Sequence, residues 1–175
     1  GIWQTVWLEP VPALSIRRIR STPHIDRSQV RITAEVSGAA QNHTVEGIAI
    51  EGGKEIARAA GKPGAPIALR IPNAKLWSPE SPHLYDLRIE LKTNGQKADE
   101  VSSYFAMRKI SIGEDEFGRT RILLNNRPHF QMGPLEQGWW PDGLYTAPTD
   151  AALRSDIEYT RKIGLNLIRK HVKTE

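Results

Sequence analysis

The sequence predicts a mainly β fold, in which an immunoglobulin-like β-sandwich is followed by the incomplete start of a (β/α)8 barrel. Apolar and polar residues alternate along several segments between Leu14 and Ile112, and short glycine and asparagine turns separate these segments. This period of two is typical of antiparallel strands that bury one face and expose the other. A single helical pattern near the C-terminus, between two short apolar runs, indicates the barrel-like part.

Three alternating sets define the predicted inner face of the sandwich. They are Val30, Ile32, Ala34 and Val36; Ile67, Leu69 and Ile71; and Tyr85, Leu87, Ile89 and Leu91. Asn94-Gly95 lies between the last set and the run 101–107, and this dipeptide favours a type I′ hairpin turn because both residues accept positive φ. Gly52-Gly53 and Gly64 mark further turns. We expect about seven short strands in all, as in immunoglobulin-like domains.

Two segments frame this region. Gly1–Pro10 alternates and stops at a proline, which predicts one strand that belongs to the end of an earlier domain. The segment 77–85 carries two prolines before the strongest alternating set, and it predicts a rigid loop anchored by a buried Trp77.

The helical pattern begins after Thr149, a residue type that caps helices, and ends at Gly164. Leu153, Ile157 and Thr160 share one face of this helix. Short apolar runs at 129–132 and 165–168 flank it, so a parallel strand-helix-strand unit is predicted. One such unit leaves its sheet edges unpaired, whereas a closed barrel takes about 250 residues. We therefore expect this chain to be a piece of a larger enzyme.

Candidate functional residues lie where the two predicted parallel strands end, because barrels place their sites at the carboxyl ends of strands. One segment is the loop 133–145, which includes Tyr145, and the other is the strand end 169–171. Neighbouring tryptophans and carboxylates suit a sugar, whose C–H faces stack on aromatic rings and whose hydroxyls bind carboxylates. The candidate substrate-binding residues are Arg169, His171, Glu136, Trp139, Trp140 and Asp142.

Structural alternatives stand beside each of these assignments. The two tryptophans could fill a gap between sandwich and barrel, Arg169 could form a structural ion pair, and a lone histidine such as His171 is often structural.

The composition argues against several classes of partner. The net charge is +4 and basic residues are interspersed with acidic ones, so we expect no nucleic-acid partner. The chain has no cysteine, its histidines lack metal-ligand spacing, and we assign no metal and no cofactor. No apolar run reaches the roughly 18 residues of a membrane span, so we expect no membrane partner.

Six pieces of the sequence, in order along the chain, together resemble the family 2 glycoside hydrolases, the group of β-galactosidases, β-glucuronidases and β-mannosidases. These pieces are Gly1–Glu9, Leu76–Tyr85, Phe105–Ile110, Leu124–Pro128, Gly133 and Gly164–His171. The resemblance implies three parts: residues 1–10 as the end of a jelly-roll sugar-binding domain, residues 11–112 as the immunoglobulin-like domain, and residues 113–175 as the first β-α-β portion of the catalytic barrel.

The resemblance also implies a retaining mechanism on β-linked sugars, with two carboxylates about 5 Å apart. In the family both carboxylates follow later barrel strands, so we assign no catalytic residue here and expect the sandwich to act as a spacer. Arg169 matches the family's substrate-side arginine. The implied partner is a carbohydrate substrate of the full-length protein. A homo-oligomer is a possible assembly. A periplasmic or extracellular location is favoured for the parent protein.

The sequence departs from galactosidase-type members at two places. Gly133 is followed by Pro134–Gly138 in place of a histidine-rich stretch, and Arg169 is followed by Lys170–Val172 in place of Ser-His-Tyr-Pro. These departures leave the sugar open. A stand-alone carbohydrate-binding module or an immunoglobulin-like interaction module is the alternative function.

Overall fold

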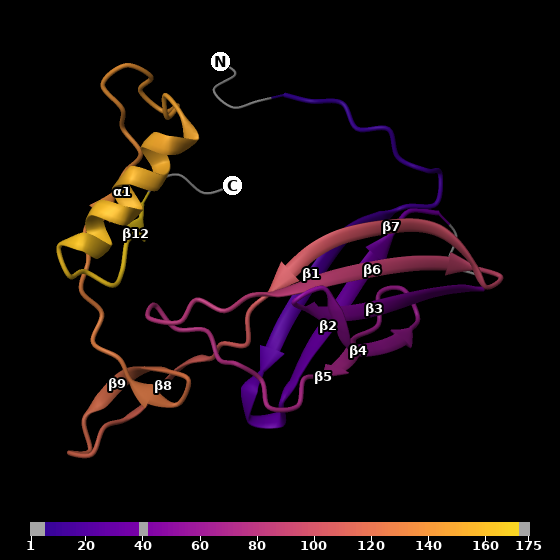
Figure 1. The fold of residues 1–175 in the computed structure, drawn as a ribbon, viewed down its shortest axis with the longest axis horizontal. Coiled ribbons are helices and arrows are strands. Elements are labelled where there is room, and N and C mark those ends of the chain that lie inside the picture. Colours follow the sequence, from indigo (N-terminus) through magenta and orange to yellow (C-terminus); the bar gives the residue numbers. More distant parts are fainter. Residues whose placement is uncertain (1–5, 39–41, 172–175) are drawn as a thin grey trace. The chain divides into compact units, whose positions relative to one another are not determined.

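The computed structural model describes residues 6–38 and 42–171, and the chain divides into two compact units (Figure 1). One unit is Pro10–His129, and the other combines the N-terminal residues up to Glu9 with the segment from Phe130 onward. The fold is mainly β, as the alternation predicts. The predicted domain division at residues 10 and 112 remains a prediction.

Seven strands of the first unit form two antiparallel sheets that share one core (Figure 1). The three-stranded sheet has the order β1-β2-β5, with β1 Ile16–His24, β2 Gln29–Val36 and β5 Ile67–Arg70, and a short 3-10 helix, Ile25–Arg27, joins β1 to β2. The four-stranded sheet has the order β4-β3-β6-β7, with β4 Lys54–Gly61, β3 His43–Glu51, β6 Tyr85–Thr93 and β7 Gln96–Phe105. This is a β-sandwich.

The core contains the residues that the alternation selects. Ten of the eleven predicted inner-face side chains are buried, and Val36 is half-buried at the end of β2. Both sheets contribute: a Cβ built on Gly47 of β3 would lie 3.4 Å from Leu69 Cδ1 of β5. The sheets are therefore joined by direct apolar packing, which is the main stabilising term for such a fold.

The predicted type I′ hairpin is confirmed. Asn94 has φ 51° and Gly95 has φ 81°, and their neighbours Thr93 and Gln96 pair directly. The strand after the turn begins at Gln96, ahead of the predicted run 101–107, because a two-residue turn returns the chain to pairing at once. Gly52 and Gly53 make the equivalent turn between β3 and β4.

The loop before β6 is anchored as predicted, but by a different residue. Trp77 is half-buried, with the Arg108 guanidinium 4.8 Å from its ring centroid, so the prediction of a buried Trp77 is wrong. The indole instead supplies a face for the cation. Tyr85 is the buried anchor: it is 2% exposed and its hydroxyl accepts a hydrogen bond from the Lys75 backbone N–H at 2.7 Å.

The outer face of the four-stranded sheet carries a charge cluster around Glu46. The Glu46 carboxylate binds the Lys92 ammonium group and lies 2.9 Å from the Arg58 guanidinium. These hydrogen bonds favour the ionised carboxylate, first from Lys92 and then from Arg58, and they hold the pKa of Glu46 below its ordinary value.

We expect the contribution of this charge cluster to the free energy of unfolding to decrease at acidic pH. A carboxyl whose pKa is lowered by folding stabilises the protein above its unfolded pKa, and the contribution is lost as the pH falls through the folded pKa. We expect Glu46→Gln to lower the urea midpoint at about pH 7 and to lower it less at about pH 3. Glu114→Gln, on the exposed end of β8 (Ile110–Glu114), is the control. An equal loss at both pH values would contradict the role of this ion cluster.

A small sheet that was not predicted from the sequence follows the sandwich. Its order is β10-β9-β8, with β8 Ile110–Glu114, β9 Thr120–Leu124 and β10 Arg127–Pro128. The pairs Ile110↔Leu124 and Ile112↔Ile122 put four apolar side chains on one face. Asp26 of the 3-10 helix contacts residues that flank these strands, since Lys109 Nζ lies 2.6 Å and Asn126 Nδ2 lies 2.7 Å from its carboxylate.

The second unit is a strand-helix-strand segment with parallel strands. It consists of β11 Leu135–Glu136, α1 Asp150–Lys162 and β12 Arg169–Lys170. The predicted helix limits are confirmed, because Thr149 Oγ1 accepts from the Ala152 N–H at 3.1 Å and Gly164 has φ 87°. None of the described helices is long and apolar enough to cross a bilayer.

Two strand predictions need correction. The strands flanking α1 are not at 129–132 and 165–168 but later in the chain, at 135–136 and 169–170. Apolar runs selected the earlier positions, whereas the regular pairing forms beyond them. The predicted strand Gly1–Pro10 lies partly outside the described residues, and Val6–Pro10 form no strand. Val6, Trp7 and Leu8 are exposed, and an extended segment needs a partner strand to satisfy its backbone.

Candidate functional site

The candidate site is the edge at which the two parallel strands of the second unit end. Leu135 pairs with Arg169 and Glu136 with Lys170. The Arg169 N–H donates to the Pro134 carbonyl at 2.9 Å, and the His171 N–H donates to the Glu136 carbonyl at 2.8 Å. Because parallel strands end at the same edge, the segment after Glu136 and the segment Arg169–His171 lie side by side.

Side chains also meet at this edge. Gln137 Nε2 lies 3.2 Å from His171 Nδ1, so the residue that follows β11 contacts the residue that follows β12. His171 is half-buried. A hydrogen bond to one ring nitrogen fixes the orientation of the imidazole and leaves the other nitrogen available for a further partner.

Glu136 and Lys170 form a cross-strand ion pair, whereas Arg169 belongs to the other face of the strand pair. This division follows from the alternation of side chains along a strand. Glu136 is partly buried and bound by the Lys170 ammonium group. Arg169 is exposed, so its guanidinium is the accessible charged group of β12 on its own face.

The two strands approach closely where Gly133 faces Leu167. A Cβ on Gly133 would overlap the Leu167 carbonyl oxygen, so only glycine fits there. Asn166 secures the same crossing, because its Nδ2 donates to the Phe130 carbonyl at 2.8 Å and its Oδ1 accepts from the Met132 N–H at 3.0 Å. This role of Asn166 was not predicted from the sequence.

The loop that follows β11 closes on itself. The Trp140 N–H donates to the Leu144 carbonyl at 2.9 Å, and the Leu144 N–H donates back at 3.0 Å. Asp142 is exposed between them. The rings of Trp139 and Tyr145 then pack against each other in a tilted arrangement, with centroids 4.4 Å apart and a 40° angle between their planes.

The structure thus brings part of the predicted site together. Glu136, Arg169 and His171 lie at one edge, joined by backbone pairing. Trp139, Trp140 and Asp142 lie in the loop that leaves this edge, and Trp140 contributes its backbone to the closure of that loop. Lys170 and Gln137 were not predicted as site residues, because their partners depend on the strand register.

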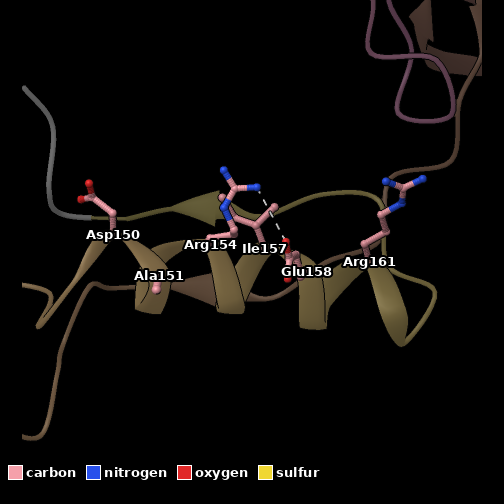
Figure 2. Close-up of a pocket in the computed structure, with 6 residues that line it drawn as sticks. All are labelled: Asp150, Ala151, Arg154, Ile157, Glu158 and Arg161. Atoms are coloured by element: carbon pink, nitrogen blue, oxygen red, sulfur yellow. Dashed lines mark ion pairs between the residues drawn. The ribbon is translucent and has the colours of Figure 1, made fainter.

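An open hollow runs along one face of α1 (Figure 2). Figure 2 shows Asp150, Arg154, Ile157 and Arg161 on the same side of the helix, with Arg154 forming an ion pair with Glu158. None of the candidate residues lines this hollow. Among residues 6–38 and 42–171, no group of three acidic or histidine side chains is arranged to hold a metal ion.

Comparison with known proteins identifies the family of this chain. Two proteins named "Putative beta-glucuronidase" from Formosa agariphila are 30% identical over 161 residues and 22% identical over 183 residues. The matches cover 85% and 97% of this chain but only 14% and 21% of those relatives. The chain therefore spans about a fifth or less of the curated relatives that it matches.

Solved structures of a β-glucuronidase from Ruminococcus gnavus share the fold. Among them are a complex with D-glucuronic acid and the apo structure at 1.7 Å resolution. Each has a TM-score of 0.75 and 20% identity, over 91% of this chain and 26% of the solved chain. A family model described as "Glycosyl hydrolases family 2" matches residues 14–108, more than half of the chain. The chain belongs to glycosyl hydrolase family 2.

Proposed function

We propose that this chain is part of a retaining glycoside hydrolase that acts on β-linked sugars. The sandwich serves as a spacer, and the segment β11-α1-β12 opens the (β/α)8 catalytic barrel. Family membership supports the enzyme class, and a parallel strand-helix-strand segment is the repeat from which such barrels are built. The family's retaining mechanism uses two carboxylates that we expect on later barrel strands, and this segment contributes sugar-binding residues.

The observation that carries the proposed binding role is the shared edge of β11 and β12. Arg169 is exposed there, and His171 is held by Gln137. A guanidinium binds hydroxyl and carboxylate oxygens through several N–H donors, so Arg169 is suited to a sugar or a uronic acid. The names of the relatives favour a β-glucuronide. Glu136, Trp139, Trp140 and Asp142, together with Arg169 and His171, form the proposed sugar-binding rim.

A stand-alone interaction module is the second candidate. The face formed by Ile110, Ile112 and Ile122 favours it, because these side chains are 55%, 77% and 45% exposed. A contiguous exposed apolar face is typical of a protein interface. This face belongs to the small sheet β10-β9-β8. It contains none of the proposed sugar-binding residues.

Titration of the chain with methyl β-glucuronide and methyl β-galactoside, followed by amide NMR shifts, tests the binding role of Arg169. We expect saturable shifts at 169–171 with one or both sugars. Arg169→Ala should weaken the binding by about tenfold, the effect of losing one charge-assisted hydrogen bond of about 1.4 kcal/mol. Arg161→Ala, on the exposed face of α1, is the matched control and should bind as the parent chain does. Equal affinity of the Arg169→Ala chain would refute the role.

A further inference from the structure

We infer that the ring pair Trp139 and Tyr145 is a stacking platform for one pyranose ring of the bound glycoside, and that Trp140 is a scaffold residue of the same loop. The inference rests on the proposed function, since it names how the rim recognises a carbohydrate. It adds Tyr145 to the binding residues and separates the roles of two neighbouring tryptophans.

The first step is the rigidity of the loop that presents the two rings. Reciprocal backbone hydrogen bonds join Trp140 and Leu144, and the Thr146 N–H donates to the Gly143 carbonyl at 2.9 Å. Leu144 has φ 52°, a left-handed conformation that non-glycine residues adopt rarely. A side chain at Gly143 would overlap the Thr146 carbonyl oxygen. The loop thus keeps a strained and closed shape that fixes both ring positions.

The second step is the exposure of the rings. Trp139 is 55% exposed and Tyr145 is 41% exposed, although the two rings contact each other. Trp140 is half-buried and its backbone closes the loop. Two large aromatic side chains that support each other and are left partly exposed offer an apolar ring face with a phenolic hydroxyl beside it.

The third step is the chemistry of the neighbouring residues. Asp142 is exposed at the tip of the loop, and Gln137 and Glu136 lie just before Trp139 in the chain. An apolar protein partner would have to desolvate these polar groups without matching them. A pyranose instead offers a C–H face to the rings and hydroxyls to the carboxylate and amide groups.

The test follows the five tryptophan indole N–H signals of the full chain during titration with methyl β-glucuronide and, separately, methyl β-galactoside. We expect the Trp139 signal to shift saturably and the Trp77 signal, which belongs to the other unit, to stay fixed. Trp139→Ala and Tyr145→Ala should each weaken binding by about three- to tenfold. Tyr145→Phe keeps the ring and should bind nearly as the parent chain does.

The controls separate loss of the ring from loss of the loop. Unchanged amide chemical shifts of Trp140 and Leu144 show that an alanine variant keeps the loop. If these shifts change, Trp139→Phe is used instead of Trp139→Ala. It keeps an aromatic ring and should bind with most of the parent affinity. The absence of a saturable Trp139 shift with either sugar, or unchanged affinity of the Trp139→Ala chain, overturns the inference. Loss of binding in Arg169→Ala together with full binding in Trp139→Ala would overturn this inference and leave the proposed function standing. The reverse result would retain the platform and refute the role of Arg169.

Discussion

Leu69→Ala is expected to destabilise the sandwich by about 3 kcal/mol, within the range of about 2–5 kcal/mol found for buried leucines. Leu69 is fully buried on β5, and its side chain packs against Gly47 of the opposite sheet. Removal of three carbon atoms loses their transfer free energy and leaves a void that Gly47, which has no side chain, does not fill. Hydrogen exchange of the core amides of β2, β3 and β6 measures the loss.

The same contact permits a double-mutant test. A Cβ on Gly47 would lie 3.4 Å from Leu69 Cδ1 and 3.7 Å from Ile89 Cδ1, so Gly47→Ala crowds the parent core slightly. In the Leu69→Ala background the added methyl group enters the void instead. We expect the effect of Gly47→Ala on the free energy of unfolding to be more stabilising in the Leu69→Ala background than in the parent chain by about 1 kcal/mol, the value of roughly one buried methyl group.

Leu84→Ala is the control for both measurements, because Leu84 is 50% exposed in the loop before β6. It should cost well under half of the Leu69→Ala effect. Strict additivity of Gly47→Ala and Leu69→Ala would show that the two sheets do not pack through this contact. A Leu69→Ala cost as small as that of Leu84→Ala would contradict its place in the core.

The sandwich was predictable because apolar and polar residues alternate along the strands that form its inner faces. Leu87 and Ile89, for example, are separated by one polar residue and both are buried in the structure. The small sheet β10-β9-β8 could not be found this way. Ile110 and Ile112 alternate just as regularly but remain exposed, and periodicity alone does not tell an apolar face that packs from one that does not.

The rim was predictable in outline and not in its pairings. The order strand, helix, strand and the cap at Thr149 are local signals, and the structure contains both. The contacts Glu136 with Lys170 and Gln137 with His171 depend on the register of the two strands. A slip by one residue would turn each side chain to the other face, so a sequence alone does not define these partners.

The register itself depends on Gly133, and Gly133→Ala should disrupt the rim. The added Cβ would overlap the Leu167 carbonyl oxygen, a backbone atom that cannot rotate away. Overpacking against a fixed group costs about 1–3 kcal/mol or more. We expect the amides of Asn166, Arg169 and His171, which donate across the two strands, to exchange at least about tenfold faster.

Gly113→Ala is the matched control for this substitution. Its Cβ would lie 2.7 Å from Leu123 Cδ1, the end of a flexible side chain that can move aside, so little change is expected. The sandwich amides of β3 and β6 should exchange as in the parent chain in the Gly133→Ala variant, because Gly133 belongs to the other unit. If Gly133→Ala left the exchange of the Arg169 and His171 amides unchanged, the strands would not meet at this glycine. The geometry that joins Arg169, His171 and Glu136 at one edge would then have to be abandoned, together with the binding rim built on it.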